Sequence, residues 1–254
     1  MKQTPILYSG PMVRAYIDDD KQHTRRVSGL GRINQNQDRY KFIGVGYPQI
    51  KGGRGPFSAF FEFEDHGVTF TESVKCPWGG PGDEMWLRET WRPFGFHEGE
   101  SIIAQYRADM GTKDIFDADE EWETRMAEQA AAECEKGNCP VNEDGEFCPD
   151  EEHPLPVKWR PSIHMPRVVS RLTQTLLEVR VERLQDITED DCKAEGVDTL
   201  VEGGIVECGR RKTVYRELWD HLNAKRGFPW DSNPYVWVLK YPKYSDEPTR
   251  KVKV

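Results

Sequence analysis

Short strand-like and helix-like patterns follow one another along this chain, with turn-forming residues between them. The stretch from Ser58 to Phe70 combines aromatic residues with alternating polarity, which predicts a hairpin. Leu177, Val179 and Val181 alternate with charged neighbours and predict a half-buried strand. Further strands are predicted at residues 40–45, 85–87 and 235–240, and helices at 12–17, at 117–136, between Thr188 and Gly196, and from Val214 to Gly227. Elements this short predict an α+β fold, a small mixed β-barrel with peripheral helices and long insertions.

Two stretches interrupt this pattern. Residues 28–56 are rich in Gly, Asn and Gln and contain few apolar anchors apart from one short strand. Residues from about 113 to 156 are acidic and contain cysteines. We therefore expect one domain over residues 1–254 that carries these two segments as insertions.

The charge of the chain is distributed unevenly. The formal net charge is -9, but the segment from Lys113 to Glu152 holds fifteen acidic against three basic residues, so the remainder carries +3. Many of the remaining basic residues are arginines. They fit either a solvated surface or a face that contacts phosphate groups.

The expected environment follows from what the sequence lacks. No stretch approaches the roughly eighteen consecutive apolar residues of a membrane span, and the N-terminal residues lack the basic and apolar regions of a signal peptide. We therefore expect a cytoplasmic protein without a membrane partner. The six cysteines then indicate reduced thiols or metal ligands before disulfides.

Three cysteines and a histidine have the spacing of a zinc site. Cys134, Cys139, Cys148 and His153 are separated by four, eight and four residues in a segment that contains Gly and Pro. Tetrahedral zinc takes four such ligands, and a site with four protein ligands is structural because no position is left open. The alternative is an acidic surface loop that contains cysteines.

Lys21 and Thr24 lie three residues apart, directly after the first predicted helix, and Arg25 and Arg26 follow. This pattern alone is typical of a solvated lysine and a turn threonine. Larger motifs surround it: PMVRAYIDDDKQHTRR, CPWGGPGDEMWLRETW, WRPSIHMPRVVSR, LEVRVERLQDITEDDCKAEG, LWDHLNAKRG and WDSNPYVWVLKY.

Together these motifs resemble the ASCH domain proteins of phages and prophages, a branch of the PUA-like superfamily. The resemblance runs nearly end to end and implies a PUA-like β-barrel related to folds that bind RNA or modified bases. Small bacterial ASCH proteins are amidohydrolases that remove the acyl group from N4-acetylcytidine with a lysine, a threonine and a glutamate. The matching positions in this chain are Lys21, Thr24 and Glu195.

The resemblance implies the following chemistry. Lys21 accepts a proton, Thr24 attacks or orients the attacking water, and Glu195 protonates the leaving amine. Arg25 and Arg26 supply positive charge to the substrate-binding side, and the reaction needs no cofactor. This chain has Asp18, Asp19 and Asp20 where the family usually has a glycine. Their negative charge acts to raise the pKa of the lysine, although Asp tolerates the left-handed backbone.

A second segment, from Trp159 to Arg167, combines an aromatic, a histidine and basic residues between prolines. Trp159 is placed to stack a base, His164 to exchange a proton or donate a hydrogen bond, and Arg167 to hold a phosphate. The alternative is a rigid connection whose tryptophan and methionine fill the end of the barrel.

Three functions therefore compete. The first is an amidohydrolase that removes an N4-acyl group from cytosine. The second is a non-catalytic module that binds a modified nucleoside or single-stranded nucleic acid, with Arg25, Arg26, Arg167 and Arg171 on phosphates and Trp159 on a base. The third is a nuclease of single-stranded RNA, with Lys21 and His164 as acid and base. The sequence does not indicate the oligomeric state.

Overall fold

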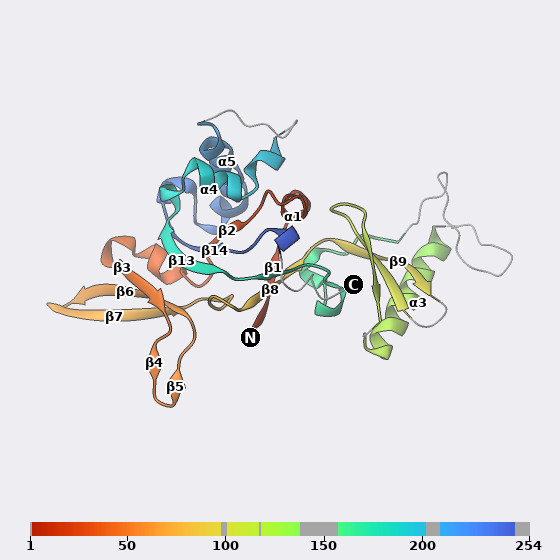
Figure 1. Ribbon diagram of the computed structural model, residues 1–254, viewed down its shortest axis with the longest axis horizontal. Coiled ribbons are helices and arrows are strands. Elements are labelled where there is room, and N and C mark those ends of the chain that lie inside the picture. Colours follow the sequence, from red (N-terminus) through yellow and green to blue (C-terminus); the bar gives the residue numbers. More distant parts are fainter. Residues whose placement is uncertain (1, 98–100, 117, 138–156, 202–208, 247–254) are drawn as a thin grey trace. The chain divides into compact units, whose positions relative to one another are not determined.

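Figure 1 shows the computed structural model, which describes residues 2–97, 101–116, 118–137, 157–201 and 209–246. The strands form small sheets and the helices are few, so the fold is mixed α+β, as the sequence predicts. The chain divides into two compact units, described separately below. The first unit comprises Met1–Pro5, Arg14–Trp86 and Thr173–Val254, and the second comprises Ile6–Val13 and Leu87–Leu172. The single domain with two insertions stays a prediction.

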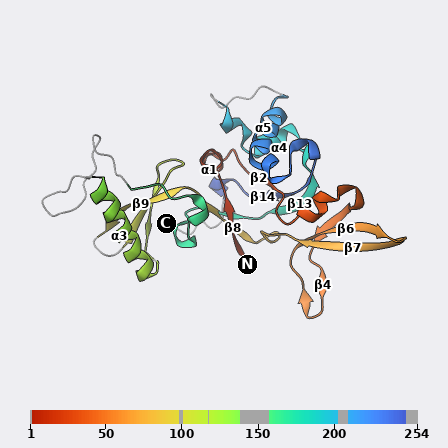
Figure 2. The ribbon, with the colours of Figure 1, turned by 180° about the vertical axis from the view of Figure 1, so that it is seen from behind.

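An antiparallel sheet in the order β13–β14–β2 organises the first unit. Its strands are β13 (Glu178–Arg183), β14 (Tyr235–Lys240) and β2 (His23–Arg26). Helices α4 (Glu189–Ala194) and α5 (Arg211–Asn223) lie on the same side of this sheet in both views (Figures 1 and 2). Strand and helix residues share one apolar core, to which α5 contributes Tyr215 and Trp219. The buried sheet face therefore fixes where both helices lie.

A second sheet of the first unit has the order β3–β6–β7. Its strands are β3 (Lys41–Gly46), β6 (Ser58–Asp65) and β7 (Val68–Lys75). Phe61 is fully buried and packs edge-on against Tyr40 and Tyr235. A two-stranded hairpin of β4 (Gln49–Ile50) and β5 (Gly53–Arg54) lies between β3 and β6 in the chain.

The remaining elements are short. A third sheet has the order β1–β8–β12, with β1 (Gln3–Leu7), β8 (Glu84–Arg88) and β12 (Thr173–Thr175). Helices α1 (Gly10–Ile17) and α2 (Gly31–Gln35) follow β1 and β2. Single 3-10 turns occupy Gln37–Arg39, Ser162–His164, Arg167–Val169, Leu184–Asp186, Val197–Leu200, Ala224–Arg226, Trp230–Ser232 and Tyr244–Asp246. Within the described ranges, none of the helices has the length and apolar character needed to span a membrane.

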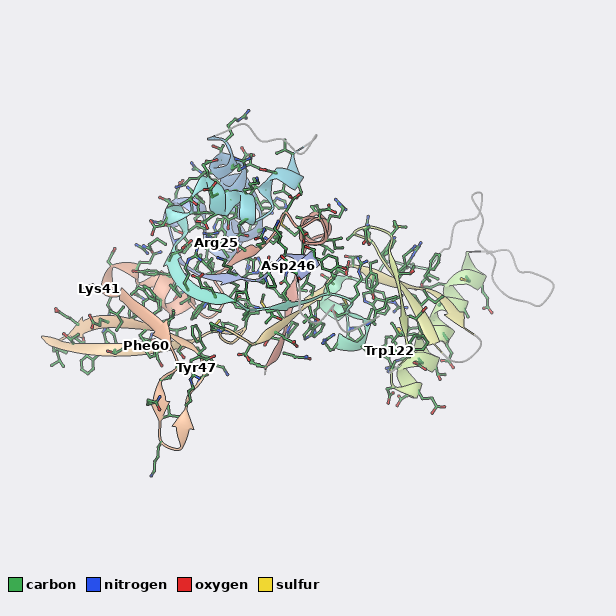
Figure 3. All side chains as sticks on the ribbon, in the orientation of Figure 1. Arg25, Lys41, Tyr47, Phe60, Trp122 and Asp246 are labelled. Atoms are coloured by element: carbon green, nitrogen blue, oxygen red, sulfur yellow. The ribbon has the colours of Figure 1, made fainter. Side chains whose placement is uncertain are left out.

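The second unit pairs a small sheet with one long helix. The sheet has the order β11–β10–β9, with β9 (Trp91–His97), β10 (Ser101–Tyr106) and β11 (Thr112–Ile115). Helix α3 (Glu120–Lys136) begins where the Asp119 carboxylate accepts the backbone N–H of Trp122, and Gly137 follows its last turn. Trp122, labelled in Figure 3, stacks near Trp91 with ring centroids 6.2 Å apart. Helix α3 confirms the helix predicted at 117–136 from its N-terminal acids and from the glycine that ends it.

The predicted barrel is the main correction. The described strands form separate sheets of two or three strands, and they do not close into a barrel. The reason lies in how the strands of two segments pair. Residues 41–75 and 91–115 form sheets of their own through adjacent antiparallel strands, so they do not extend the central sheet. Whether the fold is PUA-like in the finer sense stays a prediction.

Most predicted elements of the first unit are confirmed, with one helix face misplaced. The predicted strands over 58–70, 177–182 and 235–240 and the helices after Thr188 and around 214–222 are present. In α5, however, Tyr215 and Trp219 are buried, whereas Leu222 is 48% exposed. The prediction followed the spacing of the aliphatic residues, but the larger rings of Tyr215 and Trp219 bury more apolar surface.

One glycine fixes the end of α4 against the first helix. Gly196 has φ +80°, and a Cβ built there would lie 2.8 Å from the Ala15 Cβ. Gly227 has a similar φ of +88°, but a Cβ built on it would have no neighbour within 4 Å. The two glycines therefore share a backbone requirement and differ in packing.

We expect Gly196→Ala to destabilise the protein more than Gly227→Ala. Both substitutions place an L-residue in the left-handed region, at a cost of about 1–2 kcal/mol. Only Gly196→Ala adds a steric overlap, worth about another 1–3 kcal/mol. Urea unfolding followed by tryptophan fluorescence measures both losses. Equal losses would mean that α4 is not tightly packed at this point.

Candidate functional site

The site lies where the end of α4 meets the edge strand β2. Thr188 caps α4 by accepting the Asp191 backbone N–H, and the Asp191 carboxylate accepts the Thr188 N–H in return. At the other end, Lys21 and Glu195 form an isolated antiparallel bridge, and the Gln22 N–H donates to the Ala194 carbonyl over 2.7 Å. A short capped helix thus delivers the Glu195 carboxylate to the edge of β2.

The turn before β2 delivers the lysine. Asp19 has φ +64°, the left-handed conformation that Asp tolerates, and it ends α1. The backbone N–H of Lys21 donates to the Ala15 carbonyl over 2.9 Å. The Asp19 carboxylate accepts hydrogen bonds from the backbone and side chain of Ser245, over 3.0 and 2.6 Å. Part of the negative charge expected beside Lys21 is therefore bound to the C-terminal side of the chain.

The Lys21 ammonium is buried and hydrogen-bonded on all sides. Lys21 is 2% exposed and Glu195 is 4% exposed. The Nζ donates to the His23 carbonyl over 2.8 Å, to the Glu195 carbonyl over 2.8 Å and to the Glu195 Oε2 over 2.9 Å. An ammonium group has three donors. These three acceptors therefore match its full capacity.

Arg25 holds the other side of the Glu195 carboxylate. Its Nη1 donates to Glu195 Oε1 over 3.1 Å, and its Nε and Nη2 donate to Glu182 Oε1 over 2.9 and 2.6 Å. The Nη2 also lies 3.3 Å from Asp191 Oδ2. Because Arg25 is only 2% exposed and is surrounded by three carboxylates, it is committed to internal ion pairs.

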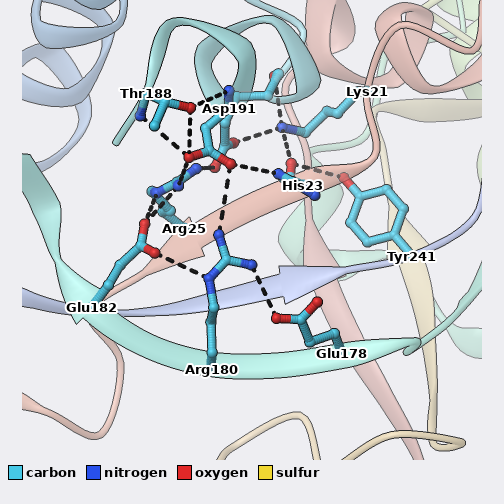
Figure 4. Close-up of polar contacts among 10 residues, drawn as sticks. Lys21, His23, Arg25, Glu178, Arg180, Glu182, Thr188, Asp191 and Tyr241 are labelled. Atoms are coloured by element: carbon cyan, nitrogen blue, oxygen red, sulfur yellow. Dashed lines mark hydrogen bonds and ion pairs between the residues drawn. The ribbon is translucent and has the colours of Figure 1, made fainter. Parts of the chain in front are cut away.

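Figure 4 shows that the network continues across the sheet. Arg180 donates to Glu182 Oε2 over 3.0 Å and lies 3.6 Å from Asp191 Oδ1. It also donates to Glu178 Oε1 over 3.3 Å. The cations and carboxylates alternate from Lys21 outward to the partly exposed Glu178, so the buried part of the site is nearly neutral.

Burial and charge act against each other on the central pair. Burial lowers the pKa of Lys21, and the opposing effect of the Glu195 carboxylate does not restore its ordinary value. Burial alone raises the pKa of Glu195, but the charges of Lys21 and Arg25 outweigh it, so the pKa is lowered. The Glu195 carboxyl is therefore ionised at neutral pH, and the Lys21 ammonium is more easily deprotonated than an ordinary lysine.

His23 faces the same network as a neutral ring. Burial lowers its pKa below the ordinary 6.5, and Arg25 and Arg180 add to this while Glu195 and Asp191 oppose it. Its Nδ1 lies 3.3 Å from Asp191 Oδ1 without hydrogen-bond geometry among the described atoms. Uptake of a proton would place another cation beside two arginines.

The strand register separates Thr24 from Arg25. In the β14–β2 pair, Arg25 lies opposite Val238 and Thr24 lies opposite Leu239. Successive side chains of a strand point to opposite faces, so Thr24 projects to the face away from Arg25. Thr24 is 1% exposed, and the described hydrogen bonds do not join it to Lys21 or Glu195. The structure therefore joins two of the three predicted catalytic residues directly.

The other predicted binding residues are distributed as follows. Arg26 is half-buried beside Arg25, and its Nη1 lies 3.5 Å from the Arg25 carbonyl. Trp159, His164 and Arg167 belong to the second unit. The Arg92 guanidinium lies 4.5 Å above the Trp159 ring, and His164 and Arg167 are exposed. Their roles stay predictions.

The binding hypothesis places Arg171 on a phosphate, but its guanidinium pairs with carboxylates of the second unit. It donates to both carboxylate oxygens of Glu89, over 2.9 and 3.0 Å, and to both oxygens of Asp109, over 2.8 and 2.9 Å. Glu89 is 1% exposed. This bidentate pairing occupies the guanidinium.

Only one member of the predicted zinc site is described. Cys134 is buried on α3 with Ala130 and Val157, whereas Cys139, Cys148 and His153 lie outside the described residues. Over the described parts of the chain, no group of three or more His, Cys, Asp or Glu residues is arranged to hold a metal ion. Structural zinc stays a prediction.

The carboxylates that support the site have no predicted function in the sequence. The alternation of Glu178, Arg180 and Glu182 with apolar residues predicts a half-buried strand and no more. Asp191 lies in the helix predicted between Thr188 and Gly196, where it completes the cap with Thr188. Both patterns contained a usable signal, because alternate charges on one strand face must find partners wherever a helix covers that face.

The buried pair can exchange a proton. In a low-dielectric site, moving one proton from Lys21 to Glu195 replaces two desolvated charges by two neutral groups. The product is a neutral amine, which can accept a proton, and a carboxylic acid, which can donate one.

No protein-family model, curated protein or solved structure matches this chain.

We expect the two halves of the central pair to contribute unequally to stability. Glu195→Gln removes the carboxylate that pairs with the buried Lys21 ammonium and one of the three carboxylates that pair with Arg25, which costs about 3–5 kcal/mol. Lys21→Met leaves Glu195 paired with Arg25 and costs less. Urea unfolding at neutral pH measures the difference. A larger loss in Lys21→Met than in Glu195→Gln would contradict this arrangement of charges.

We also expect stability to fall as the pH decreases from 7. A lowered pKa means that the unfolded state takes up a proton at His23 before the folded state does, so this part of the stability is lost below about 6.5. The lowered pKa of Glu195 produces a second loss below about 4.5. In His23→Gln, the first loss should be absent and the second should remain. Chemical unfolding at a series of pH values tests this, and an unchanged profile in His23→Gln would assign the first step elsewhere.

Proposed function

We propose that this protein is an amidohydrolase that removes an N4-acyl group from cytosine, with N4-acetylcytidine as the simplest substrate. The observation that carries the proposal is the buried Lys21–Glu195 ion pair, in which burial lowers the pKa of the lysine. The motifs described above support placing the chain in the ASCH branch of the PUA-like superfamily. In that branch, a lysine and a glutamate at these positions belong to the catalytic set.

The proposed reaction needs one proton to move within the pair before attack. Lys21 gives a proton to Glu195, which leaves an amine and a carboxylic acid. The amine then takes a proton from water as its oxygen attacks the acyl carbon. When the carbon–nitrogen bond breaks, the Glu195 acid protonates the cytosine N4. The ion pair is restored, and the products are a carboxylic acid and cytosine.

Two features favour this scheme for an acylated cytosine. The leaving group is an aminopyrimidine whose electrons are delocalised into the ring, so it leaves more readily than an ordinary amine. In addition, Arg25 holds Glu195 Oε1 at 3.1 Å while Lys21 holds Oε2 at 2.9 Å. The carboxylate is thus fixed in orientation, which lowers the cost of aligning it with the substrate.

The proposal assigns attack to water and not to Thr24. The register places the Thr24 side chain on the sheet face opposite to Arg25, whereas Arg25 contacts Glu195. A hydroxyl nucleophile would have to share a face with the group that accepts its proton. The isosteric Thr24→Val should therefore retain most of the turnover.

We expect Lys21→Met and Glu195→Gln to lower kcat/KM for N4-acetylcytidine by about 10²–10⁴-fold, the usual contribution of a general acid or base. The ultraviolet change on conversion to cytidine measures the rate. The matched control is Glu182→Gln, because Glu182 pairs with the same arginine but does not contact Lys21. Circular dichroism at the assay temperature establishes that each variant is folded.

Turnover that is lost in Glu195→Gln and kept in Glu182→Gln supports the assignment. If the parent protein does not hydrolyse N4-acetylcytidine, or if both folded variants of the pair act as fast as the parent, the proposed function is wrong. Loss of turnover in Thr24→Val with retention in Thr24→Ser would identify the hydroxyl as the nucleophile and would contradict attack by water.

A further inference from the structure

The β4–β5 hairpin is an exposed, positively charged element on an acidic protein. Its tip consists of Lys51 and Gly52, and every residue from Gln49 to Arg54 is exposed, with Ile50 at 55%. In both ribbon views the hairpin projects from the sheet of β3, β6 and β7 (Figures 1 and 2). A molecule that binds the first unit can therefore reach the tip of the hairpin.

The charge of this region opposes that of the whole chain. Residues 28–56 contain five basic residues and one acidic residue, whereas the chain as a whole has a net charge of -9. Two of the five are paired: Arg32 lies 3.3 Å from Glu72, and Arg39 lies 3.5 Å from Asp65. Within the described residues, Lys51 and Arg54 form no ion pair. Their charge faces solvent.

Arg54 also lies over an aromatic ring. Its guanidinium lies 3.5 Å from the centroid of Tyr47, which is labelled at the base of the hairpin in Figure 3. Tyr47 packs edge-on against the buried Phe57, with centroids 5.0 Å apart. Gly80 lies beneath both rings, where a Cβ would approach Phe57 to 2.7 Å and the Tyr47 hydroxyl to 2.5 Å. The ring that carries Arg54 is therefore anchored in the core.

We infer that the β4–β5 hairpin binds single-stranded nucleic acid. Lys51 and Arg54 neutralise backbone phosphates, and the guanidinium plane of Arg54, supported by Tyr47, stacks on a base. Bases stack on arginine planes and aromatic rings without a fixed sequence, so the hairpin is a general contact for a strand. The inference rests on the proposed function only in naming the target, an acylated cytosine within a polynucleotide.

Geometry and charge favour a flexible strand over a flat anionic surface. The Debye length at physiological ionic strength is about 8 Å, so a single strand that touches the tip is screened from the acidic remainder of the protein. A membrane surface extends over many such lengths and faces the net negative charge as well as the tip. Two cations are also fewer than the four to eight that stable attachment to anionic lipids requires.

The test is binding of a fluorescein-labelled oligocytidylate, as RNA and as DNA, followed by anisotropy over a series of salt concentrations. The association constant falls as the salt concentration rises, and each phosphate contact to a single strand adds about 0.7 to the steepness of log K against log salt. The double variant Lys51→Ala/Arg54→Ala removes two such contacts, so its plot should be less steep by about 1.4. At low salt its affinity should fall about tenfold or more. Tyr47→Leu should weaken binding while leaving the slope unchanged.

The matched control is Lys225→Ala/Arg226→Ala, which removes the same charge from two exposed residues at the end of α5. Binding should remain at the parent level in this variant. Equal losses in the two double variants would show a general effect of charge and overturn the inference. It would be overturned equally if the parent did not bind, or if it bound vesicles of equimolar phosphatidylcholine and phosphatidylserine through the hairpin in preference to the oligonucleotides.

The two proposals fail separately because the binding assay uses unmodified oligonucleotides and the hydrolysis assay uses a free nucleoside. Hairpin-dependent binding without nucleoside turnover would leave the inference standing and remove the amidohydrolase. Nucleoside turnover with binding that is insensitive to the hairpin substitutions would do the reverse. RNA and DNA arms with different affinities would identify the natural polymer.

Discussion

The buried charge on Lys21 is the constraint on which the rest of the site depends. An ammonium removed from water is stable only where acceptors replace its hydration, and three oxygens do so here. Two of these oxygens belong to Glu195, so the end of α4 has to lie against the edge of β2. The left-handed Gly196 follows from the same requirement, because a side chain there would meet Ala15. The helix position, the turn and the strand edge thus satisfy one electrostatic demand.

Arg25 and its carboxylate partners explain how the Lys21–Glu195 pair can be stable and still exchange a proton. Arg25 shares the Glu195 carboxylate and is also paired with Glu182 and Asp191, so it keeps two counter-charges when Glu195 takes up the proton of Lys21. Without these two carboxylates, the proton transfer would leave the Arg25 charge unpaired in a low-dielectric region. The network therefore lowers the cost of passing through the neutral form without separating the two groups. This is the feature expected of a site that has to act as a base and then as an acid.

Local features of this fold were predictable from the sequence, and assembly features were not. The cap at Thr188, the stop at Gly196 and the left-handed Asp19 each depend on residues within one turn, which the sequence displays. The barrel was wrong because strand pairing is decided between segments far apart in sequence, and adjacent antiparallel pairing of β6 with β7 and of β9 with β10 competes successfully. The burial of Tyr215 and Trp219 was missed because periodicity was counted on aliphatic residues alone.

The candidate site divides in the same way. Lys21 and Glu195, which the resemblance assigns to one site, form an ion pair, but the resemblance could not place Thr24 relative to them. That depends on the side-chain alternation of β2, and a spacing of three residues does not specify which side chains meet when a turn leads into a strand. The sequence predicts Arg25 as a substrate-binding residue because a sequence shows the positive charge of an arginine but not the carboxylates with which it pairs. Three internal carboxylates make it a structural part of the site.

The contrast between this closed network and the exposed hairpin limits where a polymer can be held. Lys21, Thr24 and Glu195 are each less than 5% exposed, so a sugar-phosphate backbone has no access to them without a local opening. A base is smaller and largely uncharged, and enzymes that modify bases within a strand take the base into a separate pocket while they hold the backbone outside it. The cations that hold the backbone must then be exposed and unpaired. On the first unit, Lys51 and Arg54 meet both conditions among the described residues, whereas Arg25 meets neither. Exposed, unpaired cations on a projecting element are therefore where an acidic protein can contact an anionic polymer.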